Sequence, residues 1–268
     1  MNDKQFCVIG WPLHFTLSPF IFNTLFSELN LKAIYKRTPL HKEELKNFID
    51  SKIVSGFNVT TPYKKEMFSY LENSSEEAHT TGCINLVYEE NQKLTGHNTD
   101  GLGFAHVLRE RKIELQGKNI LIIGAGGLAQ TLAYQCCASE AKHVFIVNRT
   151  LERAHKICET FKNVNKTQLS FSQLKDIKNA FSETDMVLNT VPLYFSYFKN
   201  LSRNTFLMDF TYDRTETPYE REAHKNQTYF LNGKVFLIAQ ALYSFQKFFP
   251  QCEGIFQYEK KLQNALNC

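Results

Sequence analysis

Short apolar runs alternate with longer amphipathic segments along most of the chain, and this pattern predicts an α/β protein. In the N-terminal part, strands are predicted at residues 6–10, 33–37 and 56–60, a helix at 19–29, and a hairpin at 83–88 and 93–97. In the remainder, strands are predicted at 118–123, 143–147, 186–189, 206–210 and 229–231, and an apolar helix at 235–249. Since no low-complexity linker divides the sequence, a domain boundary has to be inferred from other signals.

The predicted strand at 118–123 runs directly into a glycine-rich turn. This turn, Gly124-Ala125-Gly126-Gly127-Leu128-Ala129, fits the G-x-G-x-x-G/A pattern, and a predicted helix follows it to about residue 139. Gly124 allows a tight turn, Gly126 lets the backbone approach a pyrophosphate, and Ala129 allows close helix–strand packing. Because a helix N-terminus favours an anion, all six residues are candidates for binding a dinucleotide cofactor.

The next strand ends in Asn148-Arg149-Thr150, which indicates the type of dinucleotide. NAD-binding proteins usually carry Asp or Glu here to hold the ribose 2′-hydroxyl. This chain has Asn and Arg instead, and Arg153 follows near the start of the next predicted helix. Two guanidinium groups suit the 2′-phosphate of NADP, so the sequence favours NADP over NAD. The alternative is a solvated helix N-terminus with incidental arginines.

Candidate catalytic groups lie in the segment Gly56-Phe57-Asn58-Val59-Thr60-Thr61-Pro62-Tyr63-Lys64 and in Asn98-Thr99-Asp100-Gly101. Pro62 interrupts strand pairing, so Lys64 is expected at a corner after the strand. An amine beside a carboxylate suits proton transfer at an alcohol or carbonyl carbon. On local signals alone, Lys64 could equally lie in a solvated surface turn, and Asp100 could cap a helix that begins near Leu102.

The blocks above resemble the shikimate dehydrogenase family, in the family's own order and over nearly the whole chain. The matching blocks are Leu17-Ser18-Pro19 with Asn23, residues 58–64, Gly82-Cys83-Ile84-Asn85, Asn98-Thr99-Asp100-Gly101, the glycine-rich turn, Asn148-Arg149-Thr150, and Tyr212, Gly233 and Gln240. Each block is weakly specific by itself, whereas all of them in register are strongly specific.

This resemblance implies a two-domain α/β fold. The N-terminal α/β substrate-binding domain would span residues 1–100, and a Rossmann-type NADP-binding domain would span 101–233. Residues 234–268 would complete the first domain, with the C-terminal helix returning to it. Substrate would lie in a cleft between the domains.

The resemblance also implies the reaction, which is the reversible NADP-dependent reduction of 3-dehydroshikimate to shikimate in aromatic amino acid biosynthesis. Lys64 and Asp100 would be catalytic, and Gly233 would join the cofactor site. The substrate-binding residues would be Thr16, Ser18, Asn58, Thr60, Asn85, Tyr212 and Gln240. Two roles stay open for Lys64, which are proton transfer and stabilisation of negative charge.

Several positions depart from the family's usual pattern and bear on substrate choice. They are Phe15 and Phe22 in place of His, Thr16 in place of Ser, Leu86 in place of Thr, Asn232 in place of Asp, Val235 in place of Gly, and Phe236 in place of Met. Two alternatives therefore stay open, a dehydrogenase of quinate or another cyclic polyol acid, and a catalytically silent NADP-binding regulatory protein. Retention of Lys64 and Asp100 argues against the silent protein.

Composition narrows the class further. Apolar residues make up 43% of the chain, and the net charge is +4 without runs of like charge, so we expect a globular protein without a nucleic-acid partner. The small-molecule substrate is what the resemblance implies. The seven cysteines are scattered and form no C-x-x-C pair, which predicts no metal site and favours the cytoplasm. Neither a signal peptide nor a membrane segment is expected. Monomer and homodimer are both compatible with the sequence.

Overall fold

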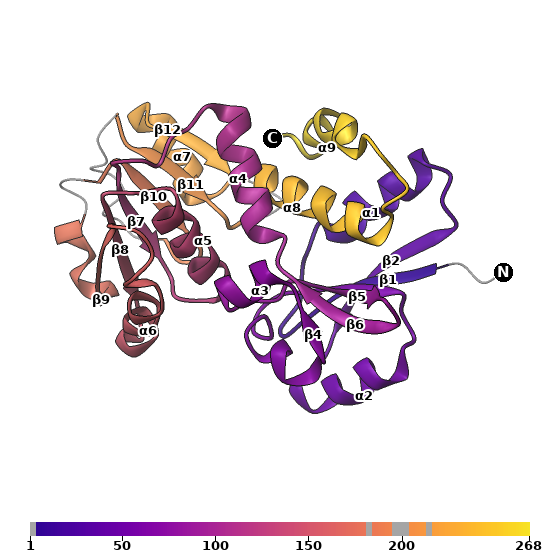
Figure 1. The fold of residues 1–268 in the computed structure, drawn as a ribbon. Helices are drawn as coiled ribbons and strands as arrows, with labels where there is room; N and C mark the ends of the chain where they lie inside the picture. Colours follow the sequence, from indigo (N-terminus) through magenta and orange to yellow (C-terminus); the bar gives the residue numbers. More distant parts are fainter. Residues whose placement is uncertain (1–3, 181–183, 195–203, 213–215) are drawn as a thin grey trace. The chain divides into compact units, whose positions relative to one another are not determined.

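The computed structural model describes residues 4–180, 184–194, 204–212 and 216–268. The chain divides into two compact units (Figure 1), one made of residues up to 104 together with 237–267, and the other of 105–236 with the last residue. It passes from one unit to the other twice, inside helix α4 (Asp100–Arg111) and inside helix α8 (Gly233–Phe248). The C-terminal segment therefore belongs to the first unit, which confirms that part of the predicted fold class.

A mixed sheet with strand order β2-β1-β3-β5-β6-β4 forms the centre of the first unit. Its strands are β1 (Lys4–Gly10), β2 (Ala33–Pro39), β3 (Gly56–Val59), β4 (Asn73–Ser74), β5 (Leu86–Glu90) and β6 (Lys93–His97). Its other helices are α1 (Ser18–Glu28), α2 (Leu45–Ser51), α3 (Glu76–Thr81) and α9 (Glu259–Leu266). Strands β2, β1 and β3 are parallel, whereas β5 and β6 form the predicted antiparallel hairpin.

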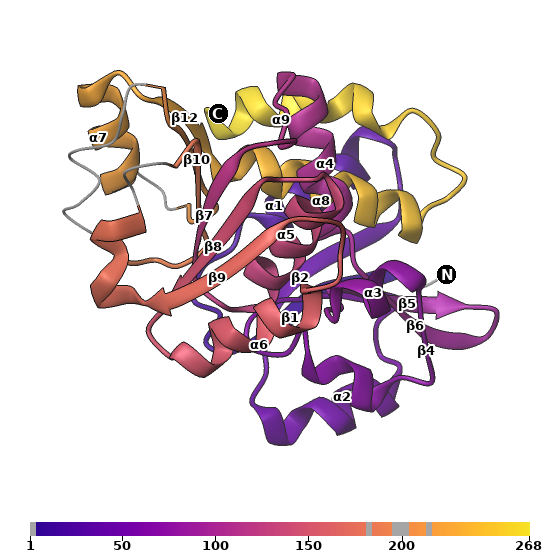
Figure 2. The same ribbon diagram turned by 60° about the vertical axis from the view of Figure 1, so that its left-hand side comes forward.

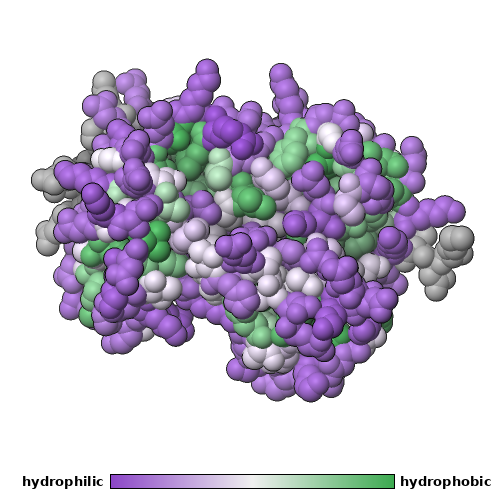
Figure 3. Space-filling model, in the orientation of Figure 1, coloured by the Kyte–Doolittle hydropathy of each residue, from purple (hydrophilic) through white to green (hydrophobic). Residues whose placement is uncertain are grey.

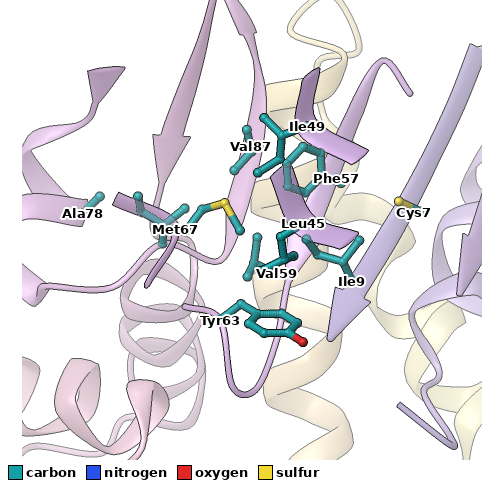
Figure 4. Packing of buried hydrophobic residues seen from close by; sticks show 11 residues of the cluster. Cys7, Ile9, Leu45, Ile49, Phe57, Val59, Tyr63, Met67, Ala78 and Val87 are labelled. Atoms are coloured by element: carbon teal, nitrogen blue, oxygen red, sulfur yellow. The ribbon is translucent and has the colours of Figure 1, made fainter. Parts of the chain in front are cut away.

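One face of this sheet is covered by a buried hydrophobic cluster (Figure 4). Phe57 and Val59 of β3 join it together with Leu45 of α2. Asn58, between them in sequence, donates instead to Ser244 of α8. Side chains along β3 therefore alternate between the two faces of the sheet, as successive residues of a strand do. Tyr63 also lies in the cluster, and its hydroxyl donates to the Leu40 carbonyl at 2.7 Å.

Aromatic rings connect α8 with α1 and β2 in the first unit. Phe22 of α1 stacks on Tyr35 of β2, with ring centroids 4.2 Å apart, and also packs against Phe245 and Phe248 of α8. All four side chains are at most 9% exposed. This packing explains why the apolar helix at the end of the chain is retained by the first unit, since aromatic side chains bury large apolar areas.

The second unit contains a fully parallel sheet. Its strands are β7 (Asn119–Ile123), β8 (His143–Asn148), β9 (Gln168–Gln173), β10 (Met186–Asn189), β11 (Phe206–Asp209) and β12 (Tyr229–Asn232). The strand order is β9-β8-β7-β10-β11-β12. If β7 is counted as the first strand, this is the dinucleotide-binding order 3-2-1-4-5-6. The order reverses between β7 and β10, so the carboxyl ends of these two strands mark the expected ligand crevice.

Three further helices belong to this unit, α5 (Gly127–Ala138), α6 (Leu151–Phe161) and α7 (Pro218–Asn226). Helix α5 packs on β7 and β8, α6 packs on β8 and β9, and α7 packs on β11 and β12 (Figure 2). The alternation of parallel strands with packed helices confirms the Rossmann-type α/β fold that the sequence predicts.

Three local details differ from the sequence-based expectations. Strand β9 was not predicted, because its sequence QLSFSQ is mostly polar. Helix α4 begins at Asp100 and not near Leu102, so Asp100 is not the capping residue proposed for a helix starting there. Pro19 favours a helix start that would make Ser18 the N-cap, but Leu17 occupies that position without a side-chain bond.

Hydrophilic residues dominate the face shown in Figure 3, where hydrophobic residues form small separate groups. Among the residues that the structure describes, the helices are all too short or too polar to cross a bilayer. In the same residues, His, Cys, Asp and Glu side chains do not gather in any group of three that could hold a metal ion.

Candidate active site

Lys64 and Asp100 form an ion pair in the first unit. Lys64 follows β3 in a turn, and its carbonyl accepts a hydrogen bond from the Ile84 N–H at 2.8 Å, which fixes the backbone of the turn. Its Nζ lies 2.5 Å from Oδ2 of Asp100. The two side chains are 14% and 3% exposed, so the alternative that Lys64 lies in a solvated surface turn is wrong.

The N-terminus of α4 supports the negative charge of Asp100. Asp100 stands in the first helical turn, where the helix dipole favours an anion. Its backbone N–H donates to Oδ1 of Asn98 at 2.9 Å, so the cap is supplied by Asn98. The Asp100 carboxylate is thereby left for other partners, which are Lys64 and Asn85.

The Asn85 side chain is bound tightly to the same carboxylate. Its Nδ2 donates to Oδ1 of Asp100 at 2.7 Å, while its Oδ1 accepts from the Thr99 N–H at 2.8 Å. A backbone N–H can only donate, so the oxygen of the amide must face Thr99 and the nitrogen must face Asp100. Asn85 is 2% exposed and holds the Asp100 carboxylate in a defined orientation.

Asn58 lies close to Asn85 but uses its side chain within the protein. Its Nδ2 donates to the Asn85 carbonyl at 3.1 Å and to Oγ of Ser244 at 3.0 Å, and its Oδ1 accepts from the Tyr35 hydroxyl at 2.8 Å. Both amide protons are therefore occupied, and only one acceptor position of Oδ1 stays available to a ligand.

The other predicted substrate residues of the first unit bond to groups other than Lys64 and Asp100. Thr16 and Ser18 form a separate pair, in which Oγ1 of Thr16 donates to Oγ of Ser18 at 3.2 Å. Thr60 is half-buried, and its N–H continues the strand pairing by donating to the Ile9 carbonyl. Gln240 is 7% exposed and donates to the Leu237 carbonyl within α8. Its backbone lies against Gly103 of α4, where a Cβ would come within 2.8 Å of it.

The glycine-rich turn stands at the switch point of the parallel sheet in the second unit. Gly124 has φ +111°, and a Cβ there would overlap Oγ1 of Thr190, the residue after β10. Gly126 precedes α5, which no side chain caps, and a Cβ there would meet nothing within 4 Å. Ala129 is fully buried in α5. A bound pyrophosphate fits three features of this turn, which are the positive φ at Gly124, the open space at Gly126 and the uncapped N-terminus of α5.

Two arginines flank the end of β8, and the strand itself ends in Asn148 and not in the acidic residue that would hold a ribose 2′-hydroxyl. Asn148 donates to the Thr150 carbonyl at 2.9 Å, and Arg149 and Arg153 are exposed on either side of the start of α6. Within the described ranges neither arginine takes part in a salt bridge, so both guanidinium groups are available to an anion. This arrangement fits a 2′-phosphate better than a free 2′-hydroxyl.

Tyr212 and Gly233 lie near the ends of β11 and β12 in the second unit. Tyr212 lines a cavity of about 400 Å³ together with Asp209, Thr217 and Arg221. Burial raises the pKa of Asp209 and outweighs four hydrogen bonds from neighbouring groups, each of which lowers that pKa. A Cβ at Gly233 would come within 2.6 Å of the Asp209 carbonyl, so close packing already explains this glycine without a cofactor.

Both halves of the chain match protein families that are already described. Residues 8–87 match the shikimate dehydrogenase substrate binding domain, and residues 107–192 match the shikimate / quinate 5-dehydrogenase domain. A shikimate dehydrogenase (NADP(+)) of Alkaliphilus oremlandii is 33% identical over 89% of each chain, and one of Methanococcus maripaludis is 31% identical over 99% of this chain and 98% of its own. This chain belongs to the shikimate dehydrogenase family.

Solved structures of the family agree with this assignment. The shikimate dehydrogenase of Aquifex aeolicus superposes with a TM-score of 0.84 at 27% identity, covering 97% of each chain. A shikimate dehydrogenase in complex with NADP+ superposes with a TM-score of 0.83 at 28% identity, covering 98% of this chain and 96% of the other. The predicted family and the predicted fold class are therefore confirmed.

Departures from the shikimate dehydrogenase pattern have clear packing roles in this structure. Phe22 stacks on Tyr35, as described above, and Leu86 is fully buried. Phe236 is 6% exposed and packs edge-on against Phe210 at 4.9 Å. Apolar residues at these three positions contribute to the two cores, which the sequence pattern alone did not show.

Sequence reasoning missed three residues that support the shikimate dehydrogenase site. Ser244 bonds to Asn58 and Thr99, Tyr35 bonds to Asn58, and Gly103 allows α4 to approach α8. Ser244 stands 186 positions after Asn58 and 145 after Thr99, so no local pattern connects them. Gly103 alone gave a usable signal, because a glycine inside a helix often marks a close approach.

Proposed function

We propose that this protein catalyses the reversible NADP-dependent reduction of 3-dehydroshikimate to shikimate. Family membership supports the reaction class, and the relatives named above carry this activity in their names. The single observation that carries the proposal is the ion pair of Lys64 and Asp100, buried and held by Asn85. A silent nucleotide-binding protein has no physical need for such a pair.

We assign the substrate to the first unit and NADP to the second. NADPH, when bound, supplies hydride to the carbonyl carbon of the substrate ring. The residues that would hold it are those of the turn 124–129 for the pyrophosphate, with Arg149 and Arg153 for the 2′-phosphate. Asn148 and Thr150 would complete that end of the site, and the relatives' specificity for NADP(+) supports this choice of cofactor.

Lys64 acts at the oxygen of the reacting carbon. As hydride arrives at the carbon, negative charge develops on the oxygen, and the Lys64 ammonium both stabilises this charge and donates a proton to it. The product is an alcohol, and the neutral amine regains its proton from solvent. In the opposite direction, the amine accepts the hydroxyl proton. Asp100, 2.5 Å away, keeps Nζ in place.

The other polar side chains predicted to bind substrate would hold the remaining groups of shikimate, a small ring with one carboxylate and several hydroxyls. Thr16 and Ser18 are the proposed carboxylate ligands, joined by Tyr212, because hydroxyl donors suit an anion. Thr60, Asn85 and Gln240 are the proposed partners of the ring hydroxyls. For Asn58 we propose a single accepting position, since its amide protons are taken by Asn85 and Ser244.

We also propose that the enzyme acts in the cytoplasm as a monomer or homodimer. The cysteine environments support a reducing compartment, since five of the seven thiols are buried and all seven are free. Burial raises the pKa of Cys7 to about 12 and of Cys158 to about 11, which keeps these thiols protonated and unreactive.

The deciding experiment mixes purified protein with shikimate and either NADP or NAD, and follows the absorbance of reduced nicotinamide. Fast reduction of NADP, slow reduction of NAD, and little turnover of quinate are the expected results. Turnover of quinate in preference to shikimate would mean that the substrate is quinate. A folded protein that binds NADP but oxidises neither compound would contradict the proposal and favour the silent regulatory protein.

A further inference from the structure

Ser244 of α8 connects two segments of the first unit that are far apart in sequence. Its side chain is completely buried. Oγ accepts from Nδ2 of Asn58 at 3.0 Å and lies 2.9 Å from Oγ1 of Thr99. A serine in a helix can bond to the carbonyl four residues earlier, but here the hydroxyl reaches to β3 and to the segment before α4. It is therefore placed between the Asn58 block and the Asp100 block.

The direction of the hydrogen bonds follows from the groups that can only donate. Asn58 gives a proton to Ser244, so the single proton of the Ser244 hydroxyl is free to go to Oγ1 of Thr99. The Thr99 hydroxyl then donates to Oδ1 of Asn85 at 3.2 Å. The opposite direction would leave the buried Ser244 proton without an acceptor among these groups, and a buried unsatisfied donor is costly.

The chain of hydrogen bonds has a fixed start and a fixed end. At its start, Nδ2 of Asn58 donates to the Asn85 carbonyl at 3.1 Å, and since a carbonyl can only accept, this fixes the orientation of the amide. The Tyr35 hydroxyl then donates to Oδ1 of Asn58 at 2.8 Å. At its end, Asn85 donates to the carboxylate of Asp100 at 2.7 Å. Every link is between side chains at most 7% exposed, so water does not compete with it.

We propose that Ser244 is a positioning residue for the reaction proposed above. Its hydroxyl joins Asn58 to Thr99 and thereby restrains the Asn85 amide that orients Asp100, and through Asp100 the Lys64 amine. This inference rests on the proposed dehydrogenase function. Without the hydroxyl, Oγ1 of Thr99 keeps only the donor from Nδ2 of Asn85 at 3.0 Å, the Asn85 amide is less restrained, and the amine spends less time in the reactive position.

Two substitutions at one position separate hydrogen bonding from packing. Ser244→Ala removes the hydroxyl, whereas Ser244→Cys keeps a side chain of similar shape with a thiol that is a weak donor and acceptor. We expect both variants to lower kcat by about tenfold, the effect of one lost buried hydrogen bond on the orientation of the reacting groups. The KM for shikimate should change by less than about twofold, because the lost interaction acts mainly in the transition state.

Thr99→Val provides an independent measure of coupling. If Ser244 acts through Thr99, the double variant Ser244→Ala/Thr99→Val should lose no more kcat than the more impaired single variant. Thr95→Val is the matched control, because it also removes one buried hydroxyl from the first unit. That hydroxyl donates to the Lys93 carbonyl at 3.3 Å, outside the chain of hydrogen bonds. Its kcat should equal that of the unaltered protein.

The same assay distinguishes failure of this inference from failure of the proposed function. If the unaltered protein oxidises shikimate and Ser244→Ala is less heat-stable but keeps full kcat, Ser244 is only structural and the inference is overturned. Full kcat in Ser244→Cys with loss in Ser244→Ala would assign the effect to packing and overturn it as well. If Thr95→Val loses as much kcat as Ser244→Ala, the loss reflects a general destabilisation of the first unit, and the inference is overturned. An unaltered protein without turnover would overturn the proposed function, and this inference with it.

Discussion

Replacement of Lys64 by Met tests the ion pair with Asp100 directly. The Asp100 side chain is 3% exposed and would lose the cation 2.5 Å away, while the Asn85 hydrogen bond at 2.7 Å would stay. Methionine has a similar length to lysine without the charge, so the change leaves a buried carboxylate without its counter-charge. Adding Asp100→Asn removes that charge again.

The expected magnitudes follow from burial. Breaking a buried ion pair by removing one partner costs about 3–5 kcal/mol, and the partial exposure of Lys64, 14%, lets water reduce this to about 2–3 kcal/mol of unfolding free energy. The double variant should recover most of this loss, because a neutral amide tolerates burial better than an unpaired charge. Turnover should fall by about 100-fold or more in the single variant and should not recover in the double variant.

Urea denaturation followed by circular dichroism measures the first effect, and shikimate-dependent reduction of NADP measures the second. Asp100→Asn should therefore restore the stability that Lys64→Met loses, but not its activity. A Lys64→Met protein as stable as the unaltered one would show that Asp100 is not buried with a charge. Full turnover in either variant would remove Lys64 from the mechanism.

Three further predictions concern the second unit and the acid stability of the first. Arg149→Ala should weaken NADP binding by about tenfold and leave NAD binding nearly unchanged, and equal losses in a fluorescence titration would contradict the 2′-phosphate assignment. Gly126→Ala should keep its melting temperature but lose NADP affinity, whereas Gly124→Ala, with φ +111°, should melt earlier; the opposite pattern would refute the proposed turn geometry. The His97 ring, 3.5 Å from Glu77, lowers the pKa of Glu77 to about 2, so Glu77 contributes stability above pH about 4.5 that is lost as the pH falls toward 2. Because the Glu77 side chain is 40% exposed, Glu77→Gln should cost only about 1 kcal/mol near neutral pH and nothing near pH 2, and a loss independent of pH would disprove this pairing.

Elements with a strong pattern could be predicted from the sequence alone. Strand β7 is a run of apolar residues before a glycine-rich turn, and the structure has it at Asn119–Ile123. The hairpin of β5 and β6 was predicted from two short runs around a polar turn. Strand β9 has alternating polar and apolar residues at the edge of the sheet, where burial on one face is enough, so its pattern was weak.

For the site, the sequence indicated the reacting groups but not what holds them. Lys64, Asp100 and Asn85 were predicted as functional residues, and the structure brings them together. Asn58 was predicted as a substrate ligand, yet its amide protons are occupied by Asn85 and Ser244. Such contacts depend on the packing of α8 against β3, which a local pattern does not contain.

Two separate stretches of chain make up the first unit, and residues 105–236 of the second unit lie between them in sequence. During synthesis, residues up to 104 leave the ribosome well before 237–267, so Phe22 and Asn58 lack their partners on α8 until that helix emerges. Residues 105–236 are continuous and can fold while the chain is still growing. A nascent chain therefore presents an unfinished aromatic surface around Phe22 and Tyr35 that chaperones can bind, and the hydrogen bonds that support Asp100 are complete only after α8 has emerged.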